Sequence, residues 1–335
     1  MRIVQTLAFI AGIGAGTAAW GLDEITDFAH NPGALRAFLH RPEGAGSNLP
    51  LIVALHGCTQ EAADFDNETG LTALADDLPA LLLLPEQTPA NMARRCFRWW
   101  DTDDNRPASG ESASILAMID HAIAVEGADP DRVFILGLSA GGSMAGVMMA
   151  NHPARFQGGA VIAGLPFDCN RPRGLFDGLW WWLHTWGLDG ADASYACGLL
   201  GAKPADREAT DWAEYARSVA AGPQIWPPVS LWQGGADGTV NPDNLRELVD
   251  QWTGLHQINA RPDSTETVGT ATRQRFFDAQ GKPRVEAWAL PGFPHAVPID
   301  GDGDPLPCGT TGAHIAEANL CAVREIARFW GLHQQ

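Results

Sequence analysis

The amino-acid sequence predicts an α/β fold, in which helices cover both faces of a mostly parallel sheet. Two features of the sequence lead to this prediction. Short apolar segments alternate along the chain with longer segments of helical character. The apolar segments are continuous, as expected for strands that are buried on both faces of a parallel sheet. Such alternation is typical of parallel strands that are joined by helical crossovers.

The predicted strands are short runs of aliphatic and β-branched side chains. Leu51–Leu55 (LIVAL) and Ala80–Leu84 (ALLLL) are typical of them. Gln280-Gly281 is a turn signal, so the last two strands are predicted to form a hairpin. In chain order, the strands are predicted at 34–40, 51–55, 80–84, 133–137, 159–163, 229–232, 272–277 and 285–290.

The predicted helices lie between these strands. Residues 112–125 have an amphipathic pattern, whereas residues 143–150 are small or apolar. A long helix is predicted to close the chain. In chain order, the helices are predicted at 68–77, 112–125, 143–150, 242–255 and 312–330.

The N-terminal segment predicts export. Residues 1–19 contain one basic residue, Arg2, then the apolar run Ile3–Ile13 and small residues up to Ala19, which is the pattern of a secretory signal peptide. An apolar N-terminal strand is the alternative. No other segment approaches the ~18 uninterrupted apolar residues of a membrane-spanning helix. We therefore expect a secreted protein, extracellular or periplasmic, with residues 20–335 as one catalytic domain.

The composition limits the partners of this domain. The chain has 22 basic and 40 acidic residues, a formal net charge of −18. This charge disfavours nucleic acid and anionic membranes as partners, because both are themselves negatively charged. The 45% of hydrophobic residues can form a sizeable core. The sequence has no low-complexity linker or repeat that would mark a second module.

The six cysteines are an even number in a chain that is predicted to be exported, which indicates disulfides. Six cysteines allow about fifteen pairings, so the sequence does not fix the connectivity. Proximity in the sequence or in the expected fold favours the pairs Cys58–Cys96, Cys169–Cys197 and Cys308–Cys321.

A serine lies between a predicted strand and a predicted helix. Gly137-Leu138-Ser139-Ala140-Gly141 has the G-x-S-x-G pattern in the strand-turn-helix context of a nucleophile elbow. A glycine-rich turn without catalytic function is the alternative, since the chain has 37 glycines and Gly110–Ser114 is a near miss. The context predicts Ser139 as a nucleophile.

Two later loops provide candidate partners for this serine. Asp237 follows the predicted strand at 229–232, and His295 follows the strand at 285–290. A serine hydroxyl needs a general base, and an acid that holds the imidazole in the right tautomer. The chain order Ser, Asp, His is that of α/β-hydrolases. The alternatives are Asp243 in place of Asp237, and His314 or His56 in place of His295.

An acyl-transfer site also needs backbone donors for the oxyanion. The N–H of Ala140, which follows the nucleophile, is the first candidate. The N–H of Cys58, after the strand at 51–55 and the His56-Gly57 turn, is the second. A simple tight turn at Gly57 is the alternative.

Several segments of the sequence resemble the esterase, polyhydroxybutyrate (PHB) depolymerase family, which groups with the feruloyl and acetylxylan esterases of carbohydrate esterase family 1. The resemblance spans about residues 25–332. It rests on LHGCTQ (55–60), LLPEQ (83–87), CFRWW (96–100), GLSAGGSM (137–144), AGLPFDC (163–169), ADGTVNPDN (236–244) and ARFWGL (327–332).

The resemblance implies a secreted serine hydrolase with an α/β-hydrolase fold, the Ser139, Asp237 and His295 triad, and a disulfide that ties the oxyanion loop to Cys96. We expect a monomer without cofactor or metal that acts on an ester or polyester. A polyhydroxyalkanoate depolymerase or oligomer hydrolase is the main hypothesis, and a feruloyl or acetylxylan esterase the second. A noncatalytic binding protein, a peptidase and a lipase are remoter alternatives on the same fold.

Three features depart from the family pattern or stand apart from it. Pro294 and Ala296 flank His295 where the family usually has glycine. A tryptophan-rich insertion, 175–186, falls in a predicted lid at about 166–205. The insertion either packs on itself or binds substrate. In the second case the predicted substrate-binding residues are Trp99, Trp100, Trp181 and Trp182. Asp300–Asp304 has the spacing of a calcium loop, but lacks the glycine and glutamate of an EF-hand, so a solvated acidic turn is the main interpretation.

Overall fold

A ten-stranded sheet forms the centre of the computed structural model, which describes residues 21–171, 196–303 and 307–332. Its six central strands are parallel, and antiparallel strands complete both edges. From edge to edge the order is β1 (Asp23–Ile25), β2 (Arg36–His40), β4 (Leu81–Glu86), β3 (Leu49–Leu55), β5 (Ala128–Leu138), β6 (Gly158–Ile162), β7 (Val229–Gly234), β10 (Pro283–Leu290), β9 (Ala271–Phe277) and β8 (Ser264–Val268). The predicted α/β fold is confirmed.

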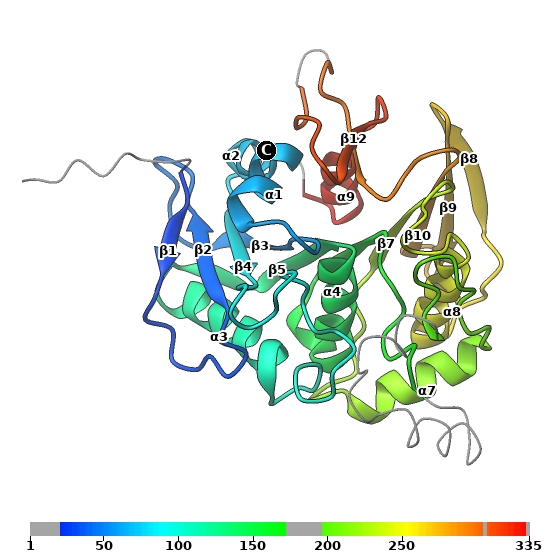
Figure 1. Cartoon of the computed structure of the whole chain (residues 1–335), viewed down its shortest axis with the longest axis horizontal. Helices are drawn as coiled ribbons and strands as arrows, with labels where there is room; N and C mark the ends of the chain where they lie inside the picture. Colours follow the sequence, from blue (N-terminus) through cyan, green and yellow to red (C-terminus); the bar gives the residue numbers. More distant parts are fainter. Residues whose placement is uncertain (1–20, 172–195, 304–306, 333–335) are drawn as a thin grey trace, which may run out of the picture.

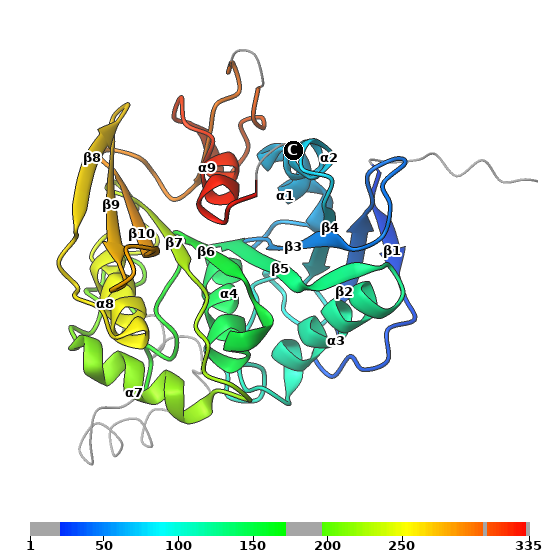
Figure 2. The ribbon, with the colours of Figure 1, turned by 180° about the vertical axis from the view of Figure 1, so that it is seen from behind.

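Helices cover both faces of this sheet (Figures 1 and 2). One face carries α3 (Gly110–Ala124), α4 (Ala140–Asn151), α7 (Ala209–Val219) and α8 (Asn244–His256). The other face carries α1 (Ala62–Thr69), α2 (Leu71–Asp77) and α9 (Ala322–Phe329). A 3₁₀ turn, η1 (Pro153–Arg155), follows α4, and a small two-stranded sheet pairs β11 (Val297–Ile299) with β12 (Ile315–Glu317).

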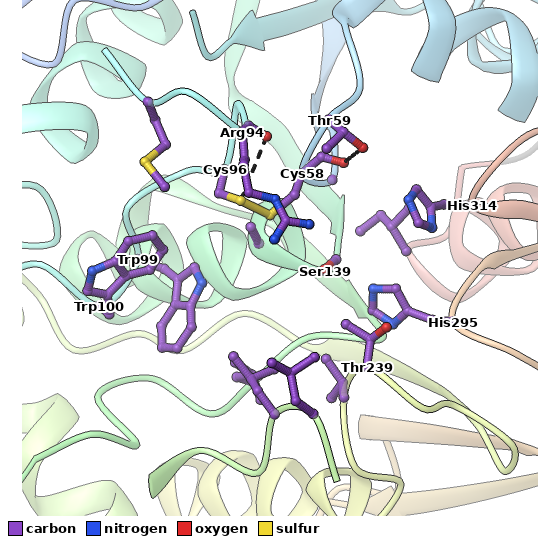
Figure 3. A pocket seen from close by; sticks show the side chains of 18 residues that line it. Cys58, Thr59, Arg94, Cys96, Trp99, Trp100, Ser139, Thr239, His295 and His314 are labelled. Atoms are coloured by element: carbon purple, nitrogen blue, oxygen red, sulfur yellow. Dashed lines mark hydrogen bonds between the residues drawn. A yellow bond between two sulfur atoms is a disulfide. The ribbon is translucent and has the colours of Figure 1, made fainter. Parts of the chain in front are cut away.

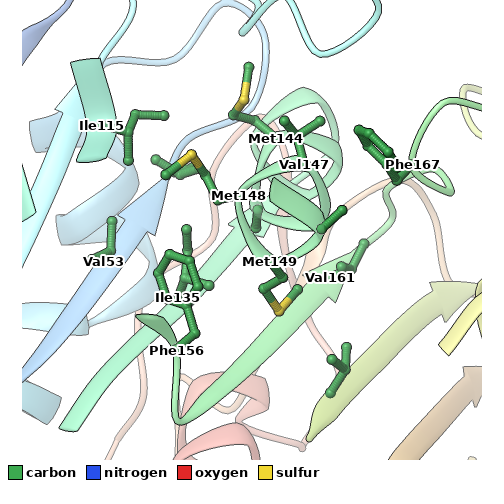
Figure 4. Packing of buried hydrophobic residues seen from close by; sticks show 14 of the residues in the cluster. Val53, Ile115, Ile135, Met144, Val147, Met148, Met149, Phe156, Val161 and Phe167 are labelled. Atoms are coloured by element: carbon green, nitrogen blue, oxygen red, sulfur yellow. The ribbon is translucent and has the colours of Figure 1, made fainter. Parts of the chain in front are cut away.

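The alternation of side chains along each central strand divides the core into two clusters. In β3, Leu51 and Val53 pack with α3 and α4, whereas Ile52 and Ala54 pack on the opposite face with α1 and α2. Figure 4 shows Met144, Val147, Met148 and Met149 of α4 against β5 and β6. Because the central strands are buried on both faces, their apolar runs are continuous in the sequence.

Two helix predictions were wrong in their extent. The helix predicted at 68–77 is two helices, which Gly70 separates in a left-handed conformation at φ 72°. The helix predicted at 312–330 begins only at Ala322, and residues 315–317 form β12 instead. This strand pairs with β11 in a parallel register, a tertiary contact that local sequence cannot indicate.

The cysteines are joined as Cys58–Cys96, Cys169–Cys197 and Cys308–Cys321, the pairs that the sequence favours. No helix in the described ranges is long and apolar enough to cross a membrane. The predicted signal peptide at 1–19 and the tryptophan-rich run with Trp181 and Trp182 lie outside the described residues, as does Asp304.

Candidate active site

Ser139 occupies the sharp turn between β5 and α4. Its backbone has φ 56° and ψ −119°, a conformation that is costly for a residue with a side chain. The neighbouring glycines make the turn sterically possible. A Cβ on Gly141 would lie 2.2 Å from the carbonyl oxygen of Leu55, and one on Gly137 would lie 2.3 Å from that of Gly141. The turn therefore has the geometry of a nucleophile elbow.

Asp237 and His295 come together from two loops at the same edge of the sheet. Nδ1 of His295 lies 2.7 Å from Oδ2 of Asp237. The same carboxylate accepts hydrogen bonds from Gln233 Nε2 at 2.9 Å and from the N–H groups of Thr239 and Val240 at 2.8 Å each. These donors fix the carboxylate, which in turn fixes the orientation of the imidazole.

The environment of Asp237 favours its charged form. Burial by itself raises the pKa of this carboxyl, but the hydrogen bond from His295, the charge of His295 and the two backbone N–H donors together hold the pKa below its usual value. Asp237 is therefore an anion at neutral pH and can stabilise an imidazolium beside it.

The alternatives to Asp237 and His295 occupy other places. Asp243 is exposed at the N-terminus of α8 and has no contact with an imidazole in the described structure. His56 is buried, where its Nδ1 donates to the carbonyl oxygen of Gly57 and its Nε2 accepts from the N–H of Gln87. Desolvation lowers its pKa to about 4, so His56 is a neutral, structural residue at neutral pH.

His314 lies beside the candidate base but does not replace it. Its ring meets that of His295 edge to face, with 5.9 Å between centroids. Its pKa is lowered by burial and by the charge of His295. It is His295, and not His314, that is bonded to Asp237.

The loop after β3 supplies the second candidate oxyanion donor. The side chain of Gln60 holds this loop, because its Oε1 accepts from the N–H of Gly57 at 2.9 Å. The disulfide from Cys58 to Cys96 and the hydrogen bond from Thr59 N–H to the carbonyl oxygen of Arg94, at 2.6 Å, tie it to the next loop. Among the described residues, the N–H of Cys58 has no hydrogen-bond acceptor.

Ala140 is the first residue of α4, so its N–H has no acceptor within the helix. Ala140 and Cys58 both line the pocket that contains Ser139. Backbone N–H groups at a helix N-terminus favour negative charge.

Ser139 and His295 both line one cavity of about 370 Å³ (Figure 3). Its walls are mostly apolar, and Trp99 and Trp100 stand edge to face on one side with 5.4 Å between their ring centroids. The lining residues are Gly57, Cys58, Thr59, Met92, Arg94, Cys96, Trp99, Trp100, Leu138, Ser139, Ala140, Leu165, Leu199, Leu200, Thr239, Val240, His295 and His314.

Of the predicted site residues, Ser139, His295, Cys58, Ala140, Trp99 and Trp100 line this cavity, and Asp237 is bonded to His295. The structure adds several residues that the sequence did not single out. Gln233 bonds to Asp237 from the end of β7, and the loop at Leu199 and Leu200 reaches the cavity through a bridge between Leu199 and Val240. No sequence motif points to these residues: the bond to Asp237 identifies Gln233, and the cavity lining identifies Leu199 and Leu200. The described residues contain no group of three or more metal-ligating side chains, and Asp304 of the predicted acidic turn lies outside them.

Comparisons with known proteins identify the family of this chain. The family described as "Esterase PHB depolymerase" matches residues 35–171. Poly(3-hydroxyalkanoate) depolymerase C of Paucimonas lemoignei is 35% identical over 95% of this chain and 72% of its own length. Feruloyl esterase B of Talaromyces stipitatus is 26% identical over 84% of this chain and 74% of its own length.

The fold has a close counterpart among solved structures. The acetyl xylan esterase from Aspergillus awamori superposes with a TM-score of 0.73 at 21% identity, and covers 93% of this chain and 99% of that one. At this identity the similarity shows the fold alone. The sequence match to the depolymerase, over nearly the whole chain, shows the family. The chain belongs to the esterase PHB depolymerase family, and it is a carboxylic ester hydrolase with an α/β-hydrolase fold.

Proposed function

We propose that this chain is a secreted serine esterase in which Ser139, His295 and Asp237 form the catalytic triad, and that it hydrolyses polyhydroxyalkanoate polyesters or their oligomers. One observation carries the proposal. His295, which is held by its 2.7 Å hydrogen bond to Asp237, and the strained Ser139 elbow line the same cavity. The parallel sheet brings the three loops to the carboxyl ends of their strands, but it does not require that a serine, a histidine and a carboxylate meet there.

The proposed reaction has two steps. His295 takes the proton of the Ser139 hydroxyl as its oxygen attacks the ester carbonyl, and the N–H groups of Cys58 and Ala140 stabilise the oxyanion. Collapse of this intermediate breaks the carbonyl–oxygen bond of the ester, and His295 returns the proton to the departing alcohol. Water then attacks the acyl-Ser139 ester by the same sequence, so that one ester and one water become one acid and one alcohol.

Polyhydroxyalkanoates are the proposed substrate class for two reasons. A relative that is 35% identical over 95% of this chain is a poly(3-hydroxyalkanoate) depolymerase. The cavity is also lined by aliphatic and aromatic side chains, among them Met92, Leu165 and Trp99, which suit the short alkyl branches of such a polyester. Trp99 and Trp100 are the proposed contacts for the chain of the polymer.

A feruloyl or acetylxylan esterase is the second candidate. It is favoured by relatives with those activities, which are 26% identical to this chain over 84% of it. The two classes differ in the acyl group, since ferulate needs a flat aromatic slot and acetate needs little space.

Secretion is part of the proposal. Three disulfides within the described residues suit an oxidising compartment. N-terminal sequencing of exported protein should find cleavage near Ala19, and a mature chain that starts at Met1 would contradict export.

The proposal is tested with a panel of substrates and a label. The purified protein should clear a polyhydroxybutyrate suspension faster than it hydrolyses methyl ferulate or releases acetate from acetylated xylan. A fluorophosphonate should modify Ser139, as located by peptide mass spectrometry, and Ser139→Ala should abolish both labelling and clearing. Faster hydrolysis of methyl ferulate would favour the second candidate, and inertness towards every ester would favour a noncatalytic binding protein.

A further inference from the structure

The charge at the cavity is opposite to that of the whole chain. The protein has 40 acidic and 22 basic residues. Even so, none of the 18 residues that line the described cavity is an aspartate or glutamate, and Arg94 is the one lysine or arginine among them. A small ligand in this cavity therefore meets one full positive charge and no lining carboxylate.

Arg94 differs from the arginines that follow it in the same loop. Arg95 forms an ion pair with Glu61, and Arg98 pairs with Asp101 and, at 3.0 Å, with Asp104. Within the described part of the chain, the guanidinium of Arg94 has no carboxylate within ion-pair distance. Its charge is exposed and available to a ligand.

The position of Arg94 is fixed relative to the nucleophile. Its carbonyl oxygen accepts the N–H of Thr59 at 2.6 Å, and the disulfide from Cys58 to Cys96 spans the same two loops. Figure 3 shows the guanidinium directed into the cavity on the side of Ser139. An anionic group on a substrate that is bound at Ser139 can therefore reach it.

We propose that Arg94 binds the free terminal carboxylate of a short hydroxyalkanoate oligoester, so that the enzyme releases hydroxy acid from the carboxyl end of the oligomer. This inference rests on the proposed function. In a dimer of a hydroxy acid, the carboxylate belongs to the alcohol side of the ester bond, a few bonds from the scissile carbonyl. Guanidinium and carboxylate match in shape and charge, and can form two parallel hydrogen bonds.

The reaction that follows needs no further reactant. Water and the dimer become two hydroxy acids, one through the acyl-Ser139 ester and the other as the departing alcohol. The departing hydroxy acid keeps its carboxylate on Arg94 until it dissociates. Neutral esters lack this contact, which makes Arg94 a residue for substrate preference and not for the chemical step.

The test compares two substrates, one with a charged and one with a neutral, methylated carboxyl end. The linear dimer of 3-hydroxybutyrate and the methyl ester of that dimer contain the same internal ester bond. The quantity measured is kcat/KM for cleavage of this bond, given as the ratio of free acid to methyl ester. We expect the native protein to favour the free acid. Arg94→Gln should lower the ratio on the order of 10- to 100-fold, the usual effect of losing a hydrogen bond to a charged group.

Two further variants separate recognition from structure. Arg94→Lys keeps the charge without the planar fork and should restore part of the ratio. Arg95→Gln is the matched control, because Arg95 pairs with Glu61 and does not line the cavity, so its ratio should equal that of the native protein. Raising the salt concentration should lower the ratio in the native protein more than in Arg94→Gln, because salt screens an exposed charge.

The outcomes distinguish this inference from the proposed function. If Arg94→Gln leaves the ratio of kcat/KM for free acid to methyl ester unchanged, whether or not both values fall, the carboxylate contact is overturned while the esterase assignment stands. A native protein that cleaves neither dimer, yet hydrolyses methyl ferulate, would overturn the substrate class itself.

Discussion

Asp237 illustrates how single residues determine the site. Its two carboxylate oxygens are occupied by His295, Gln233 and the backbone of the following residues. With every lone-pair direction used, the carboxylate is held in one orientation. The sequence identifies Asp237 by its place after a strand, and the supporting bond from Gln233 comes from the same segment, whereas the bond to His295 is a tertiary contact across 58 positions.

A pair of substitutions tests the assignment of the acid. Asp237→Asn should lower kcat by roughly 10³- to 10⁴-fold, because an amide can hold the imidazole in the wrong tautomer. The matched control is Asp243→Asn at the exposed start of α8, which should retain native activity in a p-nitrophenyl butyrate assay. Comparable losses in both variants would contradict the role of Asp237.

The same assay distinguishes the role of His295 from that of the neighbouring His314. His295→Ala should reduce kcat by roughly 10⁴-fold or more, since the serine loses its base. His314→Ala should reduce it by less than about tenfold, because His314 touches the ring of His295 but not Asp237. Near-native activity of His295→Ala would end the triad assignment.

Glu111 is a buried carboxyl that joins α3 to the loop of the cavity tryptophans. It accepts hydrogen bonds from the side chain of Gln87 and, at 2.7 Å, from the N–H of Arg98. Desolvation raises its pKa from 4.5 to about 8. The sequence shows this residue only within the near-miss motif at 110–114, where nothing indicates its burial.

The raised pKa predicts a pH dependence of stability. Between pH 4.5 and about 8, the folded state keeps a proton on Glu111 that the unfolded state loses. This contribution to the free energy of unfolding is therefore full below pH 4.5 and declines as the pH rises through 8. Urea unfolding at several pH values should show a shallower decline for Glu111→Gln than for the native protein. The exposed Glu43→Gln is the control, and identical slopes for Glu111→Gln and the native protein would refute the prediction.

At the scale of elements, the contact between α4 and β3 places the nucleophile. Gly141, in the first turn of α4, lies against the carbonyl oxygens of Leu55 and His56, where a Cβ would come within 2.2 and 2.4 Å. The end of β3 also begins the loop of the second oxyanion donor. One glycine thus sets the distance between the elbow and this loop.

Two glycines of α4 should respond in opposite ways to the same substitution. Gly141→Ala should cost about 1–3 kcal/mol of stability through overpacking and should lower esterase activity by moving the loop after β3. Gly146→Ala has no atom within 4 Å of the new Cβ, so it should add about 0.5–1 kcal/mol through helix propensity. Thermal and urea unfolding measure both effects, and a stable, active Gly141→Ala would show that the contact is less tight than described.

The element predictions succeeded where a local pattern was sufficient. Continuous apolar strands and the glycine-rich elbow depend on adjacent residues, so β3, β4 and α4 were found within three residues of their bounds. For β5 only the apolar second half was found, because the strand begins at Ala128 with a polar segment. The error at 312–330 arose because β12 exists only through its pairing with β11. Strands β1 and β8, at the edges of the sheet, were missed because their exposed sequences have no apolar run.

At the scale of the whole molecule, two of the disulfides have different roles: both stabilise the fold, but one of them also lies at the active site. Cys58–Cys96 joins the two loops of the cavity, and Cys308–Cys321 joins the loop after β11 to the start of α9. Both constrain the unfolded chain. Only the first lies at the nucleophile, since Cys58 and Cys96 line the cavity.

Removing each disulfide should separate these two roles. Either double substitution, Cys58→Ala with Cys96→Ala or Cys308→Ala with Cys321→Ala, should lower the free energy of unfolding by about 2–4 kcal/mol. Only the first should also lower kcat/KM at a temperature where both variants are folded, because the N–H of residue 58 is then less well fixed. Equal activity of the two folded variants would contradict a role of this disulfide in the site.

The sequence by itself determined the fold class, the elbow serine and the order of its partners, because each depends on residues adjacent in the chain or on a simple pattern of burial. The tertiary structure decided which histidine faces Asp237, that Gln233 supports it, and that Arg94 is the one cationic side chain at the described cavity. These facts depend on which loops meet at the carboxyl ends of the strands, and on how the charges of a strongly acidic chain are distributed around them. The distances between these side chains and the pairing of charged residues depend on several segments of the chain at once, so they can be known only from the folded structure.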